Sequence, residues 1–331
     1  MKRVTHHCAR KRIATSLAIA LAVAAASTPA EEFPSKPMRL IVPFAAGGGA
    51  DLNARRLAEP LSGLWKQPVV VQNMGGAGGN LAAAATAASE PTGYTLLFAS
   101  LAIIVNNPTL YQGTLPYDPD KDLAPVVLVG QVPLVLMVNA QSPAKDVASL
   151  IALAKQRPNT LHFGSGGVGT SMHLTAELLK ARTGIDIVHV PFKGANPVVA
   201  AMMSDEVQIM FQNAGLADNQ AKTGRLKALA IASDKRMKIM PTLPTFQESG
   251  MPNFRAAITY GIYVVAGTPT SLIKRLNHDI NTVLKDATYL RQMEILGIEP
   301  GGGTPRELAD YVATEREKWV PILRKLNIKA R

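Results

Sequence analysis

The stretch Leu40-Ile-Val-Pro-Phe-Ala-Ala-Gly-Gly-Gly-Ala-Asp51 leads from an apolar segment into three glycines, and residues 51–65 have helical period. The stretch Leu161-His-Phe-Gly-Ser-Gly-Gly-Val-Gly-Thr-Ser-Met-His173 has the same order. Such a turn exposes backbone N–H groups at a helix N-terminus, where the helix dipole favours an anion. One loop of this kind is equally consistent with a tight connection. Two loops at equivalent points of two lobes predict an anion site between them, at the carboxyl ends of the strands.

Strands and helices alternate along the chain on both sides of these loops. Predicted strands in the first part are 38–43, 69–71 and 94–99, and the helices between them are 51–65 and 80–88. This βαβαβ order predicts an α/β fold with a mostly parallel sheet covered by helices. Apolar runs at 123–139 predict a crossover, a second alternating set occupies 146–231, and 258–266 is the predicted return crossing.

The C-terminal part is predicted to be helical. Thr268-Pro269 is typical of a helix start with proline in the first turn. Thr304-Pro305-Arg306-Glu307 has Thr at the cap and Glu three residues later, which predicts a capping box. Trp319 and the other apolar residues of this last helix are expected in the core.

The first thirty residues have the order of a secretory signal peptide. Five basic residues and no acid precede an apolar run at 13–26, and small residues follow as far as Ala30. The run is shorter than a membrane span, so an N-terminal anchor is the less favoured alternative. Cleavage would leave 301 residues, lower the net charge from +11 to +6 and remove the single cysteine, Cys8. We therefore expect a soluble protein outside the cytoplasmic membrane.

Composition excludes several classes of protein. With 47% hydrophobic residues the chain is globular rather than disordered. A single cysteine excludes a disulfide scaffold and a Cys-based zinc or iron–sulfur site. The histidines form no H-E-x-x-H motif, so we expect no metal and no cofactor. The basic residues are dispersed, which does not predict a nucleic-acid partner.

A secreted enzyme is the alternative function that the second glycine loop leaves open. Gly164-Ser-Gly-Gly-Val-Gly169 fits the G-x-G-x-x-G pattern of dinucleotide oxidoreductases, and Ser165 with His173 offers a nucleophile and a base of a hydrolase. However, Asp186 begins the next strand instead of ending it, and Ser165 does not fit G-x-S-x-G. Lys193 is expected near the cleft, or equally on the solvated surface.

The two quoted loops, together with Gly76-Ala-Gly-Gly-Asn80 and His189-Val-Pro-Phe-Lys-Gly194, resemble the periplasmic solute-binding receptors of tripartite tricarboxylate transporters, the Bordetella uptake gene (Bug) family. The resemblance covers residues 33–327. It implies a two-lobed, type II periplasmic-binding-protein fold of the Venus-flytrap kind with two crossing strands. It also implies that a small carboxylate binds in the cleft and passes to the permease subunits of the transporter. We expect a monomer.

The expected domain organisation has three parts. A signal peptide at 1–30 precedes a discontinuous first lobe of residues 31–131 plus 260–331, and residues 132–259 form the second lobe. In related receptors, backbone groups and bridging waters of the glycine loops hold the ligand carboxylate. The ligand-binding residues that the resemblance implies are Phe44, Ala45, Gly48, Asp51, Gly78, Asn80, Ser100, Ser165, Gly169, Thr170, His173, Lys193, Asn213 and Tyr260.

The chain departs from the family pattern at three places. Leu101-Ala-Ile-Ile104 stands where small polar residues are common, Thr259 where Trp is common, and Gln212 where Asp is common. The first departure removes polar partners and adds apolar surface. It therefore favours a ligand with an apolar or aromatic body beside its carboxylate.

Overall fold

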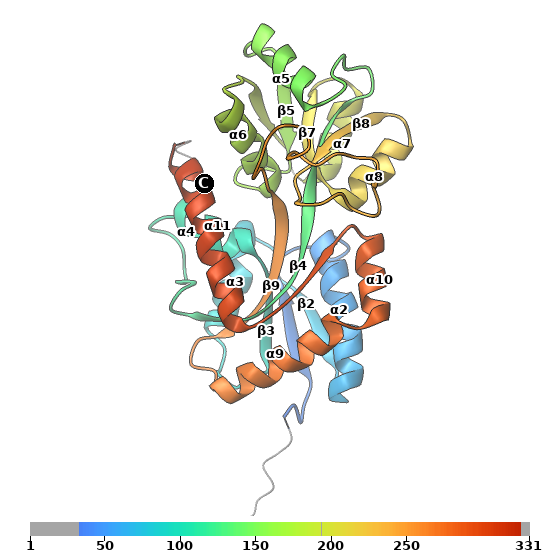
Figure 1. The fold of residues 1–331 in the computed structure, drawn as a ribbon. Coiled ribbons are helices and arrows are strands. Elements are labelled where there is room, and N and C mark those ends of the chain that lie inside the picture. Colours follow the sequence, from blue (N-terminus) through green and yellow to red (C-terminus); the bar gives the residue numbers. More distant parts are fainter. Residues whose placement is uncertain (1–32, 193, 326–331) are drawn as a thin grey trace, which may run out of the picture.

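The computed structural model describes residues 33–192 and 194–325. Figure 1 shows two lobes, connected by long strands and flanked by the C-terminal helix. Within the described ranges no helix has both the length and the apolar composition needed to cross a membrane. The segment expected to be a signal peptide lies outside the described residues.

Three parallel strands form the outer part of the first lobe's sheet. β1 (Met38–Val42) lies between β2 (Val69–Asn73) and β3 (Thr95–Ser100) and pairs with both in parallel. Four of the five residues of β1 are buried, as expected of a strand covered on both faces. The connecting helices α2 (Gly49–Trp65) and α3 (Asn80–Ala87) contact this strand. The predicted βαβαβ order is thus confirmed.

Two strands run between the lobes (Figure 1). The first part of β4 (Leu123–Asn139) pairs with β9 (Ala257–Val265), and its last part pairs with β7 (Ile209–Asn213) and β8 (Leu226–Ile231). β9 also pairs with β3. All these pairings are antiparallel, so the sheet is mixed, and the predicted parallel pairing holds for the outer strands of each lobe. The two apolar runs predicted to form a crossover are one continuous strand of 17 residues.

The second lobe repeats the parallel arrangement. β5 (His162–Ser165) lies between β6 (Val188–Pro191) and β7 and is parallel to both. The helices of this lobe are α5 (Val147–Gln156), α6 (Ser171–Thr183), α7 (Ala195–Met203) and α8 (Ala214–Lys222). The glycine loops after β1 and β5 therefore lie at the carboxyl ends of parallel strands, as the sequence predicts.

The C-terminal part completes the first lobe. Its elements are α9 (Thr270–Leu284), α10 (Ala287–Ile295), β10 (Glu299–Gly302) and α11 (Pro305–Lys325). Pro269 is the N-cap of α9 and not a first-turn residue, contrary to the prediction. The predicted capping box is confirmed, because the Glu307 carboxylate accepts from the N–H of Thr304 (2.6 Å) and Thr304 Oγ1 accepts from the N–H of Glu307 (3.2 Å).

One hydrophobic core extends through both lobes. It includes Leu97 of β3, Leu136 of β4 and Phe163 of β5, and α11 contributes Trp319 and Leu323. α11 packs on β4 and reaches α6 of the second lobe. The two lobes are therefore joined by side-chain packing as well as by the crossing strands.

Candidate functional site

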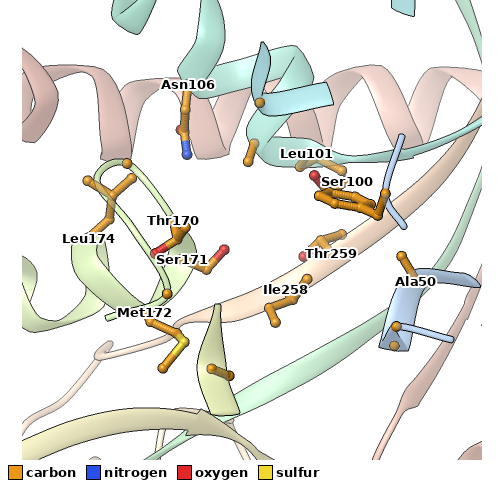
Figure 2. Close-up of a pocket in the computed structure, with 18 of the residues that line it drawn as sticks. Ala50, Ser100, Leu101, Asn106, Thr170, Ser171, Met172, Leu174, Ile258 and Thr259 are labelled. Carbon is orange, nitrogen blue, oxygen red and sulfur yellow. The ribbon is translucent and has the colours of Figure 1, made fainter. Parts of the chain in front are cut away.

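A cavity of about 750 Å³ lies between the two lobes. It is lined by the loops after β1 and β5, the segment after β3, the start of α7 and part of β9. A second cavity of about 680 Å³ shares the first glycine loop, the start of α7, Ile258 and Tyr260 with it. The two cavities therefore form one continuous cleft, in the size range of small-molecule sites. Figure 2 shows side chains that line the first of these cavities.

Asp51 fixes the first glycine loop from behind the cavity wall. Its buried carboxylate accepts hydrogen bonds from the N–H of Gly47 (2.8 Å), Nε of Arg55 (3.1 Å) and Nδ2 of Asn73 (2.9 Å). Burial disfavours the charged carboxylate, but these hydrogen bonds prevail and hold the pKa of Asp51 below its usual value. Asp51 does not line the cavity, so its observed role is to shape the loop.

Two helices begin at the cavity without a side-chain cap. α2 follows Gly48 and α7 follows Gly194, and neither glycine can offer a side chain to the first N–H groups. Gly48, Gly49, Gly194 and Ala195 line both cavities. The free N–H groups of a helix N-terminus carry a partial positive charge and bind anions. The two helix ends, one from each lobe, can therefore hold a carboxylate.

Three side chains hold the second glycine loop. Nδ1 of His173 accepts a hydrogen bond from the N–H of Gly169 (3.0 Å). Oγ of Ser165 accepts from the N–H of Gly167 (3.2 Å) and lies 2.7 Å from Nε2 of His189. Ser165 is fully buried, His173 is 4% exposed, and neither lines the cavity. They position the loop backbone, and Gly169 itself faces the cavity.

The histidine pair argues against the alternative in which Ser165 is a nucleophile and His173 its base. Ser165 contacts His189 and not His173, and a fully buried hydroxyl cannot reach a substrate. The rings of His173 and His189 stack with their centroids 3.8 Å apart. Burial lowers the pKa of His173 to about 3, assisted by the neighbouring His189, and burial lowers that of His189 to about 4. Both rings are therefore neutral at pH 7.

A third glycine loop, residues 75–79 before α3, contributes Gly78 to the cavity wall, and Asn80 at the start of α3 supports it. Gly78 has a φ of +66°, and a Cβ there would lie 2.7 Å from the Tyr111 hydroxyl, so a larger residue would strain the backbone and displace the tyrosine ring. Oδ1 of the buried Asn80 accepts from Nδ2 of Asn107 (2.6 Å) and from the hydroxyl of Tyr117 (3.1 Å). Asn80 therefore lies behind the wall.

The segment after β3 gives the cavity a wall that is in part apolar, in line with the sequence prediction. Its cavity-lining residues are Ser100, Leu101, Ala102, Val105, Asn106 and Asn107. Ile103 and Ile104 are buried behind this wall, so only part of the apolar run faces the cleft. Residues Ala102–Asn106 form a π-helical turn, η2, a rare conformation that recurs at functional sites.

The rest of the wall combines apolar side chains with one compensated charge. It includes Met172 and Leu174 of α6 and Ile258 of β9. Trp319 is buried in the core, as predicted, and also lines the cavity. Among the described wall residues Glu315 carries a charge, and its carboxylate accepts from Nε1 of Trp319 (2.7 Å) and from Nζ of Lys318 (3.1 Å).

The structure brings nine of the fourteen implied ligand-binding residues to the cavity. These are Phe44, Ala45, Gly48, Gly78, Ser100, Gly169, Thr170, Asn213 and Tyr260. Asp51, Asn80, Ser165 and His173 lie behind the wall, and Lys193 lies outside the described residues. Further lining residues that the sequence does not mark are Asn106, Leu110, Tyr111 and Leu174, because none of them belongs to a glycine loop or a local motif. Met172 lies in the second quoted stretch, but nothing in its sequence position shows that its side chain faces the cavity. In the described ranges no group of three or more His, Cys, Asp or Glu side chains could hold a metal ion.

Comparison with known proteins identifies relatives of the whole chain. The profile of the tripartite tricarboxylate transporter family receptor matches residues 53–328. BugT of Bordetella pertussis is 36% identical over 311 residues, which are 94% of this chain and 95% of BugT. A solved periplasmic transporter is 37% identical with a TM-score of 0.79, covering 90% of this chain and 99% of its own. An R. palustris protein solved with adipate is 32% identical with a TM-score of 0.79, covering 88% of this chain and 98% of its own.

Proposed function

The chain belongs to the tripartite tricarboxylate transporter receptor family, and from this premise we propose that it binds a small organic carboxylate between its lobes and delivers it to a tripartite membrane transporter. Its relatives are solute-binding receptors. The secreted-enzyme alternative, a dinucleotide oxidoreductase or a Ser/His hydrolase, is not retained, because the relatives are solute-binding receptors and Ser165 is buried away from the cleft.

One observation carries the proposal: two uncapped helix N-termini from different lobes open onto the same cavity. The first turns of α2 and α7 offer N–H donors to a carboxylate without the cost of burying an opposite charge. The R. palustris relative was solved with adipate, a molecule that carries carboxylates. The backbone donors and this relative both support an organic acid as the solute.

The solute is further proposed to have an apolar or aromatic body. Leu101 and Val105 on one side and Met172 and Ile258 on the other present hydrocarbon to the cavity. Removing apolar ligand surface from water contributes roughly 25 cal/mol per Å². A carbon skeleton that fills this space would therefore supply much of the affinity, while the helix ends orient the carboxylate.

The proposed mechanism is closure of the two lobes around the solute. The proposed first lobe is residues 31–131 plus 260–331, and the second is 132–259. The pairing of β4 changes from β9 to β7 between Pro133 and Leu134, which supports a boundary close to residue 132. In this mechanism β4 and β9 bend as the hinge.

The proposed location is the periplasm, and the proposed partner is the permease of a tripartite transporter. The family consists of periplasmic receptors. The basic, apolar and small residues at the N-terminus have the order required for export. We propose that the receptor acts as a monomer, because one chain supplies both walls of the cleft.

The variant Gly48→Asp tests the proposed anion site. The new carboxylate would cap the first N–H groups of α2 and repel a bound carboxylate. The backbone of Gly48 already has the extended conformation of an N-cap, so the substitution should not strain the backbone. We expect carboxylate affinity, measured by calorimetry, to fall at least tenfold, with the melting temperature unchanged or raised. Gly63→Asp is the matched control, because it adds the same charge at an exposed position of the same helix. Equal affinity of Gly48→Asp and wild type would refute the site.

A screen identifies the solute itself. Native mass spectrometry of the purified protein should detect a co-purified organic acid. A thermal-shift screen of aliphatic and aromatic acids should find a stabiliser, since a ligand of the folded state raises the melting temperature. The proposed function fails when no acid co-purifies and no acid shifts the melting temperature.

A further inference from the structure

The second cavity of the cleft offers space beyond the proposed carboxylate site. It has a volume of about 680 Å³, nearly that of the first cavity. The walls that it does not share with the first cavity come from α2, from the start of α8 and from the end of α10. A cavity of this size can hold a small organic group.

The uncapped helix starts stand at the junction of the two cavities. Gly48, Gly49, Gly194 and Ala195 line both of them. Away from this junction the first cavity reaches α6 and α11, and the second reaches α8 and α10. Figure 1 shows α6 and α11 on one side of the crossing strands and α8 and α10 on the other. A carboxylate held at the helix starts therefore lies between two spaces and not at the end of one.

The walls of the second cavity suit a neutral group. Leu52 of α2, Leu216 of α8 and Ile295 of α10 are large apolar side chains that line it, and all three are exposed. Exposed apolar side chains that gather at one place mark a binding surface. Asn53 and Asn219 add neutral polar groups, and none of the described residues of this wall is charged.

We propose that the solute carries its carboxylate between two arms, one in each cavity. The inference rests on the proposed function and narrows its solute class, because it takes the carboxylate as bound at the starts of α2 and α7. The apolar body occupies the first cavity, and a second, neutral arm occupies the second cavity. The solute is thus an acid substituted at the carbon next to its carboxylate, of the 2-alkyl or 2-acylamino class. An acid with its carboxylate at the end of a linear chain fills one cavity and leaves the other empty.

The second arm also favours closure of the cleft. Leu52 belongs to the proposed first lobe and Leu216 to the proposed second lobe, and both line the second cavity. An arm in this cavity contacts both lobes at once. Contacts that exist only in the closed arrangement shift the equilibrium toward it.

Isomeric acids of equal composition test the inference by calorimetry. The alkyl pair is 2-benzylpentanoate and 6-phenylhexanoate, and the amide pair is N-acetylphenylalanine and N-(3-phenylpropanoyl)glycine. The first acid of each pair carries its carboxylate between two arms, and the second carries it at the end of a chain. In at least one pair, one enantiomer of the branched acid should bind wild type about tenfold more tightly than its linear isomer. This difference corresponds to the burial of about two further methylene groups.

Narrowing the second cavity should remove this preference. Leu52→Trp and Leu216→Trp enlarge its wall from different helices, and neither residue lines the first cavity. Each variant should bind the branched acid about tenfold more weakly than wild type does, and should bind the linear isomer as wild type does. Leu64→Trp is the matched control, because Leu64 lies on the same helix, is 46% exposed against 45% for Leu52, and lines neither cavity.

The outcomes separate this inference from the proposed function. Linear isomers that bind as tightly as the branched acids overturn the inference, since the second cavity is then a water-filled entrance, and leave the carboxylate receptor standing. Retention of the full preference in both tryptophan variants also overturns it, as does a co-purified acid with a terminal carboxylate alone. The ranking in wild type decides the matter should neither variant fold. When no acid of either pair binds and no acid co-purifies, both proposals fail.

Discussion

Mild acid is expected to destabilise this protein through the two stacked histidines of the second lobe. Burial lowers the pKa of His173 to about 3 and that of His189 to about 4 in the folded chain, from an ordinary value of 6.5. Between these values the unfolded chain binds protons that the folded chain does not. The stabilising contribution is therefore complete above about pH 6.5 and is lost progressively as the pH falls toward the folded values.

The decrease in the free energy of unfolding at pH 5 follows from the burial of each histidine ring. At pH 5 an unfolded histidine is about 1.5 units below its pKa, and one unit corresponds to about 1.4 kcal/mol. His173 is 4% exposed and should account for about 2 kcal/mol. His189 is partly exposed, and solvent screening reduces its share to about 1 kcal/mol. The free energy of unfolding should thus be about 3 kcal/mol lower at pH 5 than at pH 7.

Urea denaturation at pH 7 and pH 5 measures this difference. His173→Asn keeps an acceptor for the N–H of Gly169, and His189→Gln keeps a polar partner for Ser165, but neither titrates. Each variant should lose its own share of the pH dependence, and the double variant should lose both. His278→Gln, at an exposed position of α9, should behave as wild type. A double variant with the full pH dependence of wild type would refute the reasoning.

Three further predictions concern the loops and the last helix. Gly169→Ala should weaken carboxylate binding, measured by calorimetry, about tenfold, because the φ of Gly169 is +78° and the new Cβ would lie 2.6 Å from Leu110. Gly184→Ala is the control, because Gly184 has a similar φ of +68° but open space around its Cβ position. Asp51→Asn should lower the free energy of unfolding at pH 7 by about 1–3 kcal/mol. The difference from wild type should shrink as the pH falls through the lowered pKa of Asp51, and urea titrations at pH 7 and pH 3 check this. Thr304→Ala should cost about 1 kcal/mol through loss of the capping box, and Thr304→Ser should restore it, as thermal unfolding would show.

Local sequence pattern predicts the elements of this fold better than their pairing. The outer strands are short apolar runs between glycines and helices of clear period, so their order could be read directly. The direction of β9 against β3 depends on how the chain returns from the second lobe, which no local run of residues encodes. β10 is Glu-Pro-Gly-Gly, and it forms a strand because β4 offers it an edge to pair with.

The same contrast between local sequence pattern and long-range packing applies to the site. Glycine loops mark where backbone donors lie, so Gly48 and Gly169 could be found without coordinates. The direction of a side chain next to a loop depends on packing, which turns Asp51 and His173 away from the cavity. Asn106 carries no signal in the sequence, because its place on the cavity wall depends on how the π-helical turn after β3 packs.

The uncapped starts of α2 and α7 have an evolutionary consequence. Main-chain donors are common to every amino acid except proline, so most substitutions of Gly49 or Ala195, the first residues of these helices, leave the donors in place. Side chains such as Leu101, Val105 and Asn106 line the same cavity, and each can be exchanged without changing the main chain of the helix starts. After gene duplication, a receptor of this kind can therefore change its solute one substitution at a time, while each intermediate keeps the main-chain donors for a carboxylate.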